Sequence, residues 1–164
     1  MTAKLDVDRF LDDLKRANRE SDPQAAIDEV LARTMSDPAR VLAGLGEPKV
    51  AGLHTLHHSA DLTVLNVVWA PLMMLLPHNH EMWASIGIYT AREDNILWER
   101  KGAVVEAVGA GALSEKEVFP LPHEAIHSVN NPIGRLTGAV HVYGGDFFEV
   151  PGRSEWDPET LTER

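Results

Sequence analysis

The 164-residue chain contains no cysteine, which excludes disulfide bonds, thiolate metal ligands and a cysteine nucleophile. Any metal ion that it binds must therefore be held by histidine, aspartate or glutamate. Basic residues are scarce as well, because 15 lysines and arginines stand against 25 aspartates and glutamates, for a net charge of −10. This charge repels phosphate backbones and no basic cluster offsets it, so we expect no nucleic-acid partner.

Long apolar runs are also missing. No run approaches the roughly 20 residues needed to cross a bilayer, and Met1–Asp6 lack the apolar stretch of a signal peptide. We therefore expect a cytoplasmic protein without a membrane partner. The apolar content of 44% is ordinary for a globular core, and the length suits a single domain.

The first 46 residues have the pattern of short amphipathic helices. Apolar residues recur at steps of three and four positions in the first of them. Asp22-Pro23 and Asp37-Pro38 each resemble an N-cap followed by a proline at the first helical position. The predicted helices cover residues 7–18, 23–35 and 38–45. None carries a titratable cluster, so we interpret residues 1–46 as a helical segment that packs on the rest of the fold.

Residues 47–150 have a different hydrophobic pattern, with short apolar or alternating runs separated by turn residues. We interpret Glu93-Asp94-Asn95 as a charged hairpin turn and Gly109–Gly111 as another turn. No helical patterns alternate with the runs, which favours an antiparallel barrel or sandwich over a parallel sheet. The predicted strands cover residues 52–59, 62–70, 73–80, 82–90, 95–100, 103–108, 117–119, 125–129, 136–143 and 147–150. Residues 151–164 are interpreted as a C-terminal tail.

The first informative motif is His78-Asn79-His80. In an extended segment, residues two apart point to the same face and lie roughly 6.6 Å apart along the strand. Two imidazoles at this spacing can converge on one ion. The alternative is a pair of surface histidines near a strand end.

The second motif, His123-Glu124-Ala125-Ile126-His127, has two incompatible interpretations. On a helix it would be the HExxH motif of a zinc protease, with His123 and His127 as ligands and Glu124 as general base. Prolines before and after it leave little room for a helix. The other interpretation uses only His127, near the start of a strand.

Two further pairs of side chains are candidates for contact with a substrate. His141 and Tyr143 share one face of an apolar strand, opposite Val140 and Val142. A satisfied core pair is the simplest alternative for them. His54 and His58 share a face of the predicted strand 52–59, and they contact substrate if that face is the inner one.

Together these segments resemble the cupin family, which has a double-stranded β-helix fold. The cupin second motif is matched by Pro122, His127 and Asn131, with Glu124 in place of the usual glycine. Gly87 fits the closing glycine of the first motif. The usual glutamate ligand is missing, since Ala84 and Ser85 occupy its place. The resemblance therefore implies a mostly β jelly-roll barrel with N-terminal helices and a three-histidine metal site made of His78, His80 and His127.

Within the cupins, the chain resembles the cysteine and 3-mercaptopropionate dioxygenases. Their Pro-x-x-His-x-His pattern, third histidine and downstream Ser-x-His-x-Tyr are echoed by Pro77-His78-Asn79-His80, His127 and Ala139-Val140-His141-Val142-Tyr143. Ala139 stands where the family has serine.

The resemblance implies a mononuclear Fe(II) site, with other divalent metals possible, that oxidises a small thiol to a sulfinate with O2. His141 and Tyr143 would supply hydrogen bonds to O2 or to the substrate. Family habit also implies a homodimer. Two alternatives stay open: a three-histidine cupin that cleaves diketone-like substrates, and a non-catalytic cupin that binds a metal or a metabolite.

Overall fold

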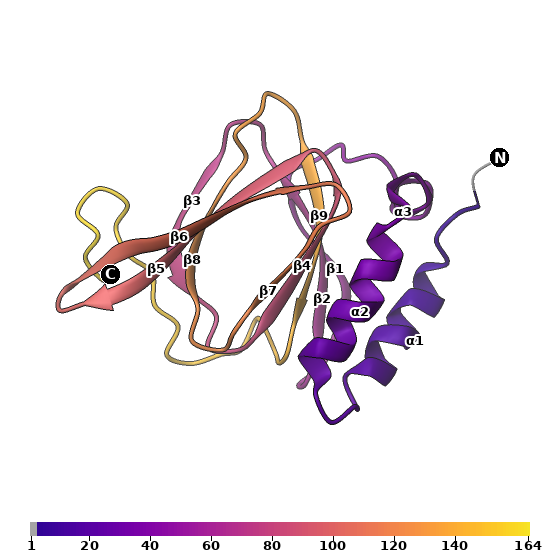
Figure 1. The fold of residues 1–164 in the computed structure, drawn as a ribbon, viewed down its shortest axis with the longest axis horizontal. Helices are drawn as coiled ribbons and strands as arrows, with labels where there is room; N and C mark the ends of the chain where they lie inside the picture. Colours follow the sequence, from indigo (N-terminus) through magenta and orange to yellow (C-terminus); the bar gives the residue numbers. More distant parts are fainter. Residues whose placement is uncertain (1–2) are drawn as a thin grey trace.

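The computed structural model describes residues 3–164, and three helices come first along the chain (Figure 1). Helix α1 covers Val7–Ala17, α2 covers Pro23–Met35 and α3 covers Pro38–Leu45. Side-chain oxygens of Asp22 and Asp37 accept hydrogen bonds from backbone amides at the starts of α2 and α3. The predicted helices are thus confirmed, and their caps are the residues that the sequence indicates.

Nine strands follow and form two antiparallel sheets. The five-stranded sheet has the order β1-β2-β9-β4-β7, and the four-stranded sheet has the order β3-β8-β5-β6. The strands are β1 (Gly52–His58), β2 (Thr63–Trp69), β3 (Met74–Asn79), β4 (Ala84–Thr90), β5 (Arg92–Lys101), β6 (Val104–Ser114), β7 (Val118–Leu121), β8 (Ile126–Asn130) and β9 (Thr137–Tyr143). The chain crosses repeatedly between the sheets, so strands distant in sequence become neighbours. The mostly β architecture with N-terminal helices is confirmed.

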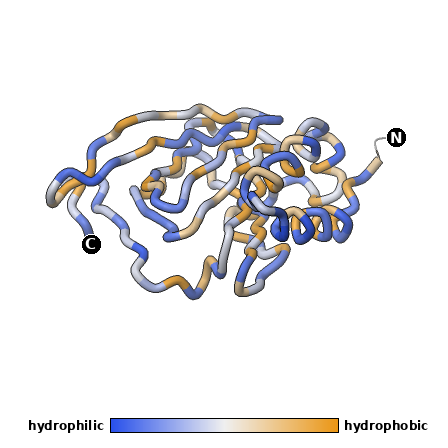
Figure 2. The backbone as a smooth tube through the Cα atoms, turned by 60° about the horizontal axis from the view of Figure 1, so that its bottom comes forward, coloured by the Kyte–Doolittle hydropathy of each residue, from blue (hydrophilic) through white to orange (hydrophobic). Residues whose placement is uncertain are grey.

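The five-stranded sheet has one face toward the helices and one toward the other sheet. Val140 and Val142 of β9 join a buried cluster with Leu14 of α1 and Leu31 of α2. Figure 1 shows α1 and α2 lying along this side of the sheet, and hydrophilic and hydrophobic segments alternate along their tubes in Figure 2. Because side chains alternate along a strand, His141 and Tyr143 of β9 face the space between the two sheets.

Three predicted boundaries are wrong. Residues 147–150 form turns and not a strand, and β6 runs straight through Gly109–Gly111. Glu93-Asp94-Asn95 belongs to β5 and pairs, in that order, with Leu113, Ala112 and Gly111 of β6. The chain instead passes from β4 in one sheet to β5 in the other at Ala91, which has a positive φ of 66°. This single residue separates the two strands, so the polar run that was interpreted as a turn extends as part of β5.

The C-terminal segment packs against the four-stranded sheet. Glu155 forms a β-bridge with His78, and the Trp156 amide donates to the Pro77 carbonyl. The Trp156 side chain is 1% exposed and packs with Val105 and Ile126. This places residues 151–156 beside the strand that carries His78. Within residues 3–164, no helix combines the length and the apolar character that a membrane crossing requires.

Candidate metal centre

Two histidines that lie two residues apart and a third that is distant in sequence meet between the sheets. Nε2 of His80 lies 3.2 Å from Nε2 of His78 and 3.1 Å from Nε2 of His127. His78 belongs to β3, and His80 is the first residue after the end of this strand. His127 belongs to β8, which pairs with β3 so that His78 lies opposite His127. Antiparallel pairing therefore brings the third ring beside the first two, and the group could hold a metal ion.

Hydrogen bonds at the other ring nitrogen fix two of these histidines. Nδ1 of His78 lies 2.9 Å from the carbonyl of Leu76, and Nδ1 of His127 lies 2.7 Å from Oδ1 of Asn95. Both oxygens accept, so both Nδ1 atoms must carry the proton. Each Nε2 atom then presents a lone pair to the centre, as a metal ligand must.

The spacing of the three nitrogens fits a metal ion. Metal–imidazole bonds of about 2.0–2.1 Å put neighbouring ligand nitrogens roughly 2.8–3.4 Å apart in octahedral or tetrahedral geometry. The two observed Nε2 separations fall inside this range. Without a cation, His80 could donate only one proton to one neighbour, and at least one lone pair would face another. A divalent ion satisfies all three nitrogens at once.

Burial keeps the three rings neutral. Burial, assisted by the charges of His78, His141 and Arg153, lowers the pKa of His80 to about 3. Burial also lowers the pKa of His127 far below its ordinary value, and it lowers the pKa of His78, although the hydrogen bond to the Leu76 carbonyl opposes that shift. Neutral imidazole is the form that binds metals.

The three nitrogens line a cavity of about 500 Å³ between the sheets. Its wall is mainly apolar, with Trp69, Leu75 and Phe147 among the lining side chains. Arg153 also lines it, with the guanidinium 5.1 Å from the ring centre of Phe147 and Nη1 2.7 Å from the Phe147 carbonyl. The cavity thus combines a metal-binding wall, an apolar body and one cationic side chain.

His141 and Tyr143 occupy the wall next to the three histidines. Nδ1 of His141 lies 3.1 Å from the hydroxyl of Tyr143, and the Tyr143 ring centre lies 5.0 Å from that of His80. Burial and the charge of Glu93 raise the pKa of the Tyr143 hydroxyl, so it stays protonated. Because Nε2 of His141 faces the Glu93 carboxylate, its Nδ1 accepts the Tyr143 proton, and the hydroxyl oxygen keeps its lone pairs for a ligand in the cavity.

Glu93 completes this row of side chains. Oε2 of Glu93 lies 3.1 Å from Nε2 of His141 and accepts a 2.6 Å hydrogen bond from Nε1 of Trp69. Burial raises the pKa of Glu93, but the charge of His141 and hydrogen bonds from His141, Asn95 and Trp69 outweigh burial, and the net shift is downward. Glu93 is therefore a buried carboxylate.

His54 and His58 do not contact the cavity, contrary to the prediction for an inner face. Nε2 of His54 lies 3.1 Å from the Val50 carbonyl, and Nε2 of His58 lies 2.7 Å from Oδ1 of Asp146. The physical reason is a register shift between Thr55 and His57, which interrupts the alternation of β1 and puts the two rings on opposite faces. Leu53 is the β1 residue that lines the cavity.

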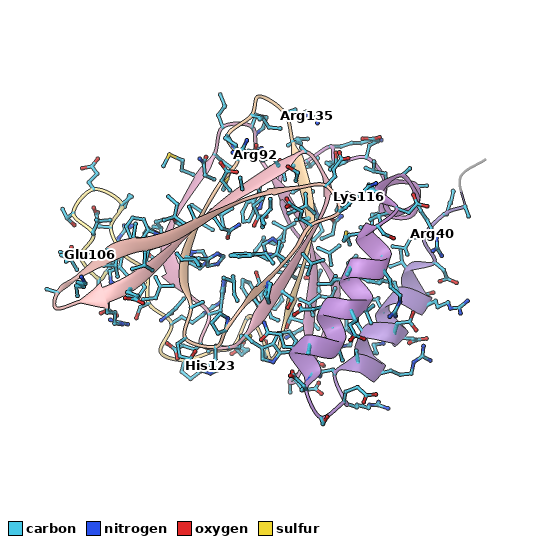
Figure 3. The ribbon with its side chains drawn as sticks, viewed as in Figure 1. Arg40, Arg92, Glu106, Lys116, His123 and Arg135 are labelled. Carbon is cyan, nitrogen blue, oxygen red and sulfur yellow. The ribbon has the colours of Figure 1, made fainter. Side chains whose placement is uncertain are left out.

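The helical interpretation of residues 123–127 is wrong. His123 and Glu124 form an exposed turn, and the chain enters β8 at Ile126. Figure 3 shows His123 at the lower end of the barrel. His127 alone reaches the metal-binding group, so a protease site of the HExxH type is excluded.

Four residues of this region escaped the sequence analysis. Glu93 and Asn95 lie two apart on β5 and share a face, a pattern that was hidden by their interpretation as a turn. Trp69 lies in an apolar predicted strand, where a tryptophan is typical of core packing and gives no separate signal of a site. Arg153 lies in the tail, ten residues beyond Tyr143, where no periodic pattern marks it.

No protein-family model matches the chain, and no curated protein matches it in sequence. Solved structures do match. A cupin-family protein with a double-stranded β-helix fold from Methanocaldococcus jannaschii superposes with a TM-score of 0.50 at 11% identity, over 63% of this chain and 87% of its own. The chain has the double-stranded β-helix fold of the cupins, and the predicted fold class is confirmed.

Two other matches have TM-scores just below this value. The cupin domain of Cnp3 from Schizosaccharomyces pombe gives 0.49 at 10% identity, over 58% of this chain and 61% of that domain. An oxalate oxidase in complex with the substrate analogue glycolate gives 0.48 at 14% identity, over 66% of this chain and 56% of its own. The present chain thus spans less than two thirds of either one.

Proposed function

We propose that this chain is a mononuclear non-haem Fe(II) dioxygenase that oxidises a small, carboxylate-bearing thiol to a sulfinate. The observation that carries the proposal is the convergence of three Nε2 atoms, from His78, His80 and His127, on the wall of a mainly apolar cavity of about 500 Å³. No carboxylate belongs to this group, so a bound divalent ion keeps its full charge and favours an anionic ligand.

The reaction balances without another reductant. A thiol R–SH and O2 give the sulfinic acid R–SO2H, with both oxygen atoms ending on sulfur. An Fe(II) ion held by the three histidines supplies the charge that lowers the thiol pKa and the redox chemistry that activates O2.

The chain's own residues orient the reactants. The Tyr143 hydroxyl lies at the cavity wall beside His80, where its oxygen can accept a hydrogen bond from a substrate, and Nδ1 of His141 holds it in place by accepting its proton. Apolar side chains such as Leu75 and Phe147 limit the water around the reacting atoms.

Arg153 supports an acidic substrate. Its guanidinium is the cationic group of the cavity lining and lies close enough to lower the pKa of His78 and His80. A substrate carboxylate placed against this guanidinium would leave the thiol to reach the histidines. A short chain between carboxylate and thiol suits the size of the cavity.

The test is O2 uptake by the anaerobically purified, Fe(II)-loaded chain with 3-mercaptopropionate, cysteine and cysteamine, with sulfinate measured by mass spectrometry. We expect one O2 consumed per sulfinate formed, and more turnover with the acidic thiols than with cysteamine. The His127→Ala variant is the negative control. O2 uptake with acetylacetone but with no thiol would replace the proposal by diketone cleavage, and uptake with neither would indicate a non-catalytic metal or metabolite site.

A further inference from the structure

The carboxylate of Glu93 is surrounded by hydrogen-bond donors. Oε2 accepts from Nε1 of Trp69 at 2.6 Å and lies 3.1 Å from Nε2 of His141, while Oε1 accepts from Nδ2 of Asn95 at 2.9 Å. Glu93 itself is 0% exposed. Both oxygens accept, so the side chain at position 93 must be an acceptor on both sides.

Two hydrogen-bonded branches leave this carboxylate. Through His141 it reaches the hydroxyl of Tyr143. Through Asn95 it reaches Nδ1 of His127, since an Asn95 amide that donates to Glu93 turns its Oδ1 toward the histidine. One branch ends at the hydroxyl that faces the cavity, and the other ends at a candidate metal ligand.

We infer that Glu93 is a positioning residue that fixes the ring protons of both His141 and His127. It thereby sets the hydrogen-bonding state of Tyr143 and the ability of His127 to bind a metal through Nε2. The inference deepens the proposed function and rests on it for the role of Tyr143. The ring protons themselves are a property of the chain alone, so they are measurable without any turnover.

The prediction for Glu93→Gln follows from counting donors and acceptors. A glutamine amide has one acceptor and one donor side. If the glutamine oxygen faces Trp69 and His141, its NH2 group faces Nδ2 of Asn95, and two donors meet. The Asn95 amide must then rotate, which turns its Oδ1 away from Nδ1 of His127. If the glutamine NH2 group faces His141, two donors again meet, and the ring proton of His141 must move from Nε2 to Nδ1. Either orientation breaks one branch.

A second substitution restores the pattern. In the double variant Glu93→Gln/Asn95→Asp, the glutamine NH2 donates to the new carboxylate at position 95. That carboxylate still accepts from Nδ1 of His127, and the glutamine oxygen accepts from Trp69 and His141. The negative charge moves from position 93 to position 95, and every donor and acceptor in the two branches is paired again.

The experiment is ¹⁵N NMR of the histidine rings in the metal-free 164-residue chain, followed by Zn²⁺ titration. In the wild type we expect a proton on Nε2 of His141 and on Nδ1 of His127. In Glu93→Gln one of these protons is lost, and loss at His127 weakens Zn²⁺ binding about 10–100-fold. The double variant recovers both protons and the affinity. Glu99→Gln, an exposed substitution on the same strand, is the matched control.

The inference is overturned if folded Glu93→Gln retains both ring protons, or if the double variant folds without regaining them. If Glu93→Gln alone does not fold, the double variant still decides the question, because it keeps the amide at position 93. Loss of the ring protons together with no sulfinate from any thiol, even in the wild type, would refute the proposed function and leave this inference standing.

Discussion

Nε2 of His141 lies 3.1 Å from Oε2 of Glu93, and both side chains are almost completely buried, at 3% and 0% exposure. The thiol dioxygenases that the sequence resembles have a serine at the position of Ala139. Alanine offers no side-chain partner to His141, and a carboxylate from another strand provides one here. The row of hydrogen bonds that ends at Tyr143 is therefore three side chains long, as in the family pattern, but with a negative charge at its far end.

His127→Ala should abolish metal retention, while His123→Ala leaves it intact. The first variant removes one of three converging Nε2 atoms, and the second alters an exposed turn outside the group. Metal content after dialysis against Fe(II), and Zn²⁺ affinity by calorimetry, measure the difference. Equal losses in the two variants would contradict the geometry described here.

Asn95→Ala should weaken metal binding without removing a ligand. Oδ1 of Asn95 accepts the Nδ1 proton of His127, and loss of such a partner typically costs 10–100-fold in metal affinity. Zn²⁺ titration of the folded variant measures the change. Asp94→Ala is the control, because Asp94 pairs with Arg92 on the exposed side of the same strand. An unchanged affinity in Asn95→Ala would show that His127 holds its proton without help.

Tyr143→Phe should keep the fold and the metal while lowering turnover by roughly 100-fold, the usual loss for one positioned hydrogen-bonding group. Tyr89→Phe is a matched control because Tyr89 is buried on the helix-facing side, where its hydroxyl donates to Asn66. Rates of O2 uptake and metal content measure the two effects. Full activity in Tyr143→Phe would remove the tyrosine from the proposed chemistry.

Arg153→Gln should raise KM for thiols that carry a carboxylate, by about tenfold or more, because a charge-assisted hydrogen bond is lost. The KM for cysteamine, which has no carboxylate, should change little. Arg135→Gln tests a general effect of charge at an exposed position away from the cavity. Similar changes for acidic and amine substrates would argue against recognition of a carboxylate.

Tyr89 predicts a loss of stability at alkaline pH. Burial raises the pKa of Tyr89 from 10.0 to about 12, although the hydrogen bond to Asn66 opposes the shift. Between these values the unfolded chain releases the proton and the folded chain keeps it, so the free energy of unfolding falls as the pH rises. Urea unfolding at several pH values, for wild type and Tyr89→Phe, isolates this contribution. The wild type should lose more stability over this interval than the variant, and parallel curves would contradict the shift.

The sequence by itself determined the helices, most of the strands and the three histidines. Proline and aspartate mark the helix starts, and the alternation of side chains along an extended chain puts His78 on the same face as His80, and His141 on the same face as Tyr143. These are local properties, set by the period of the backbone.

Only the tertiary structure decided which side chains surround those histidines. Glu93 and Asn95 looked like a turn because polar residues favour turns, and it took pairing with β6 and β8 to extend them and bury them. A one-residue irregularity in β1 puts the rings of His54 and His58 on opposite faces, and no pattern in the sequence of this strand indicates it. Hydrogen bonds between strands, bulges and the docking of the tail depend on contacts between residues far apart in the chain, and local periodicity carries no information about them.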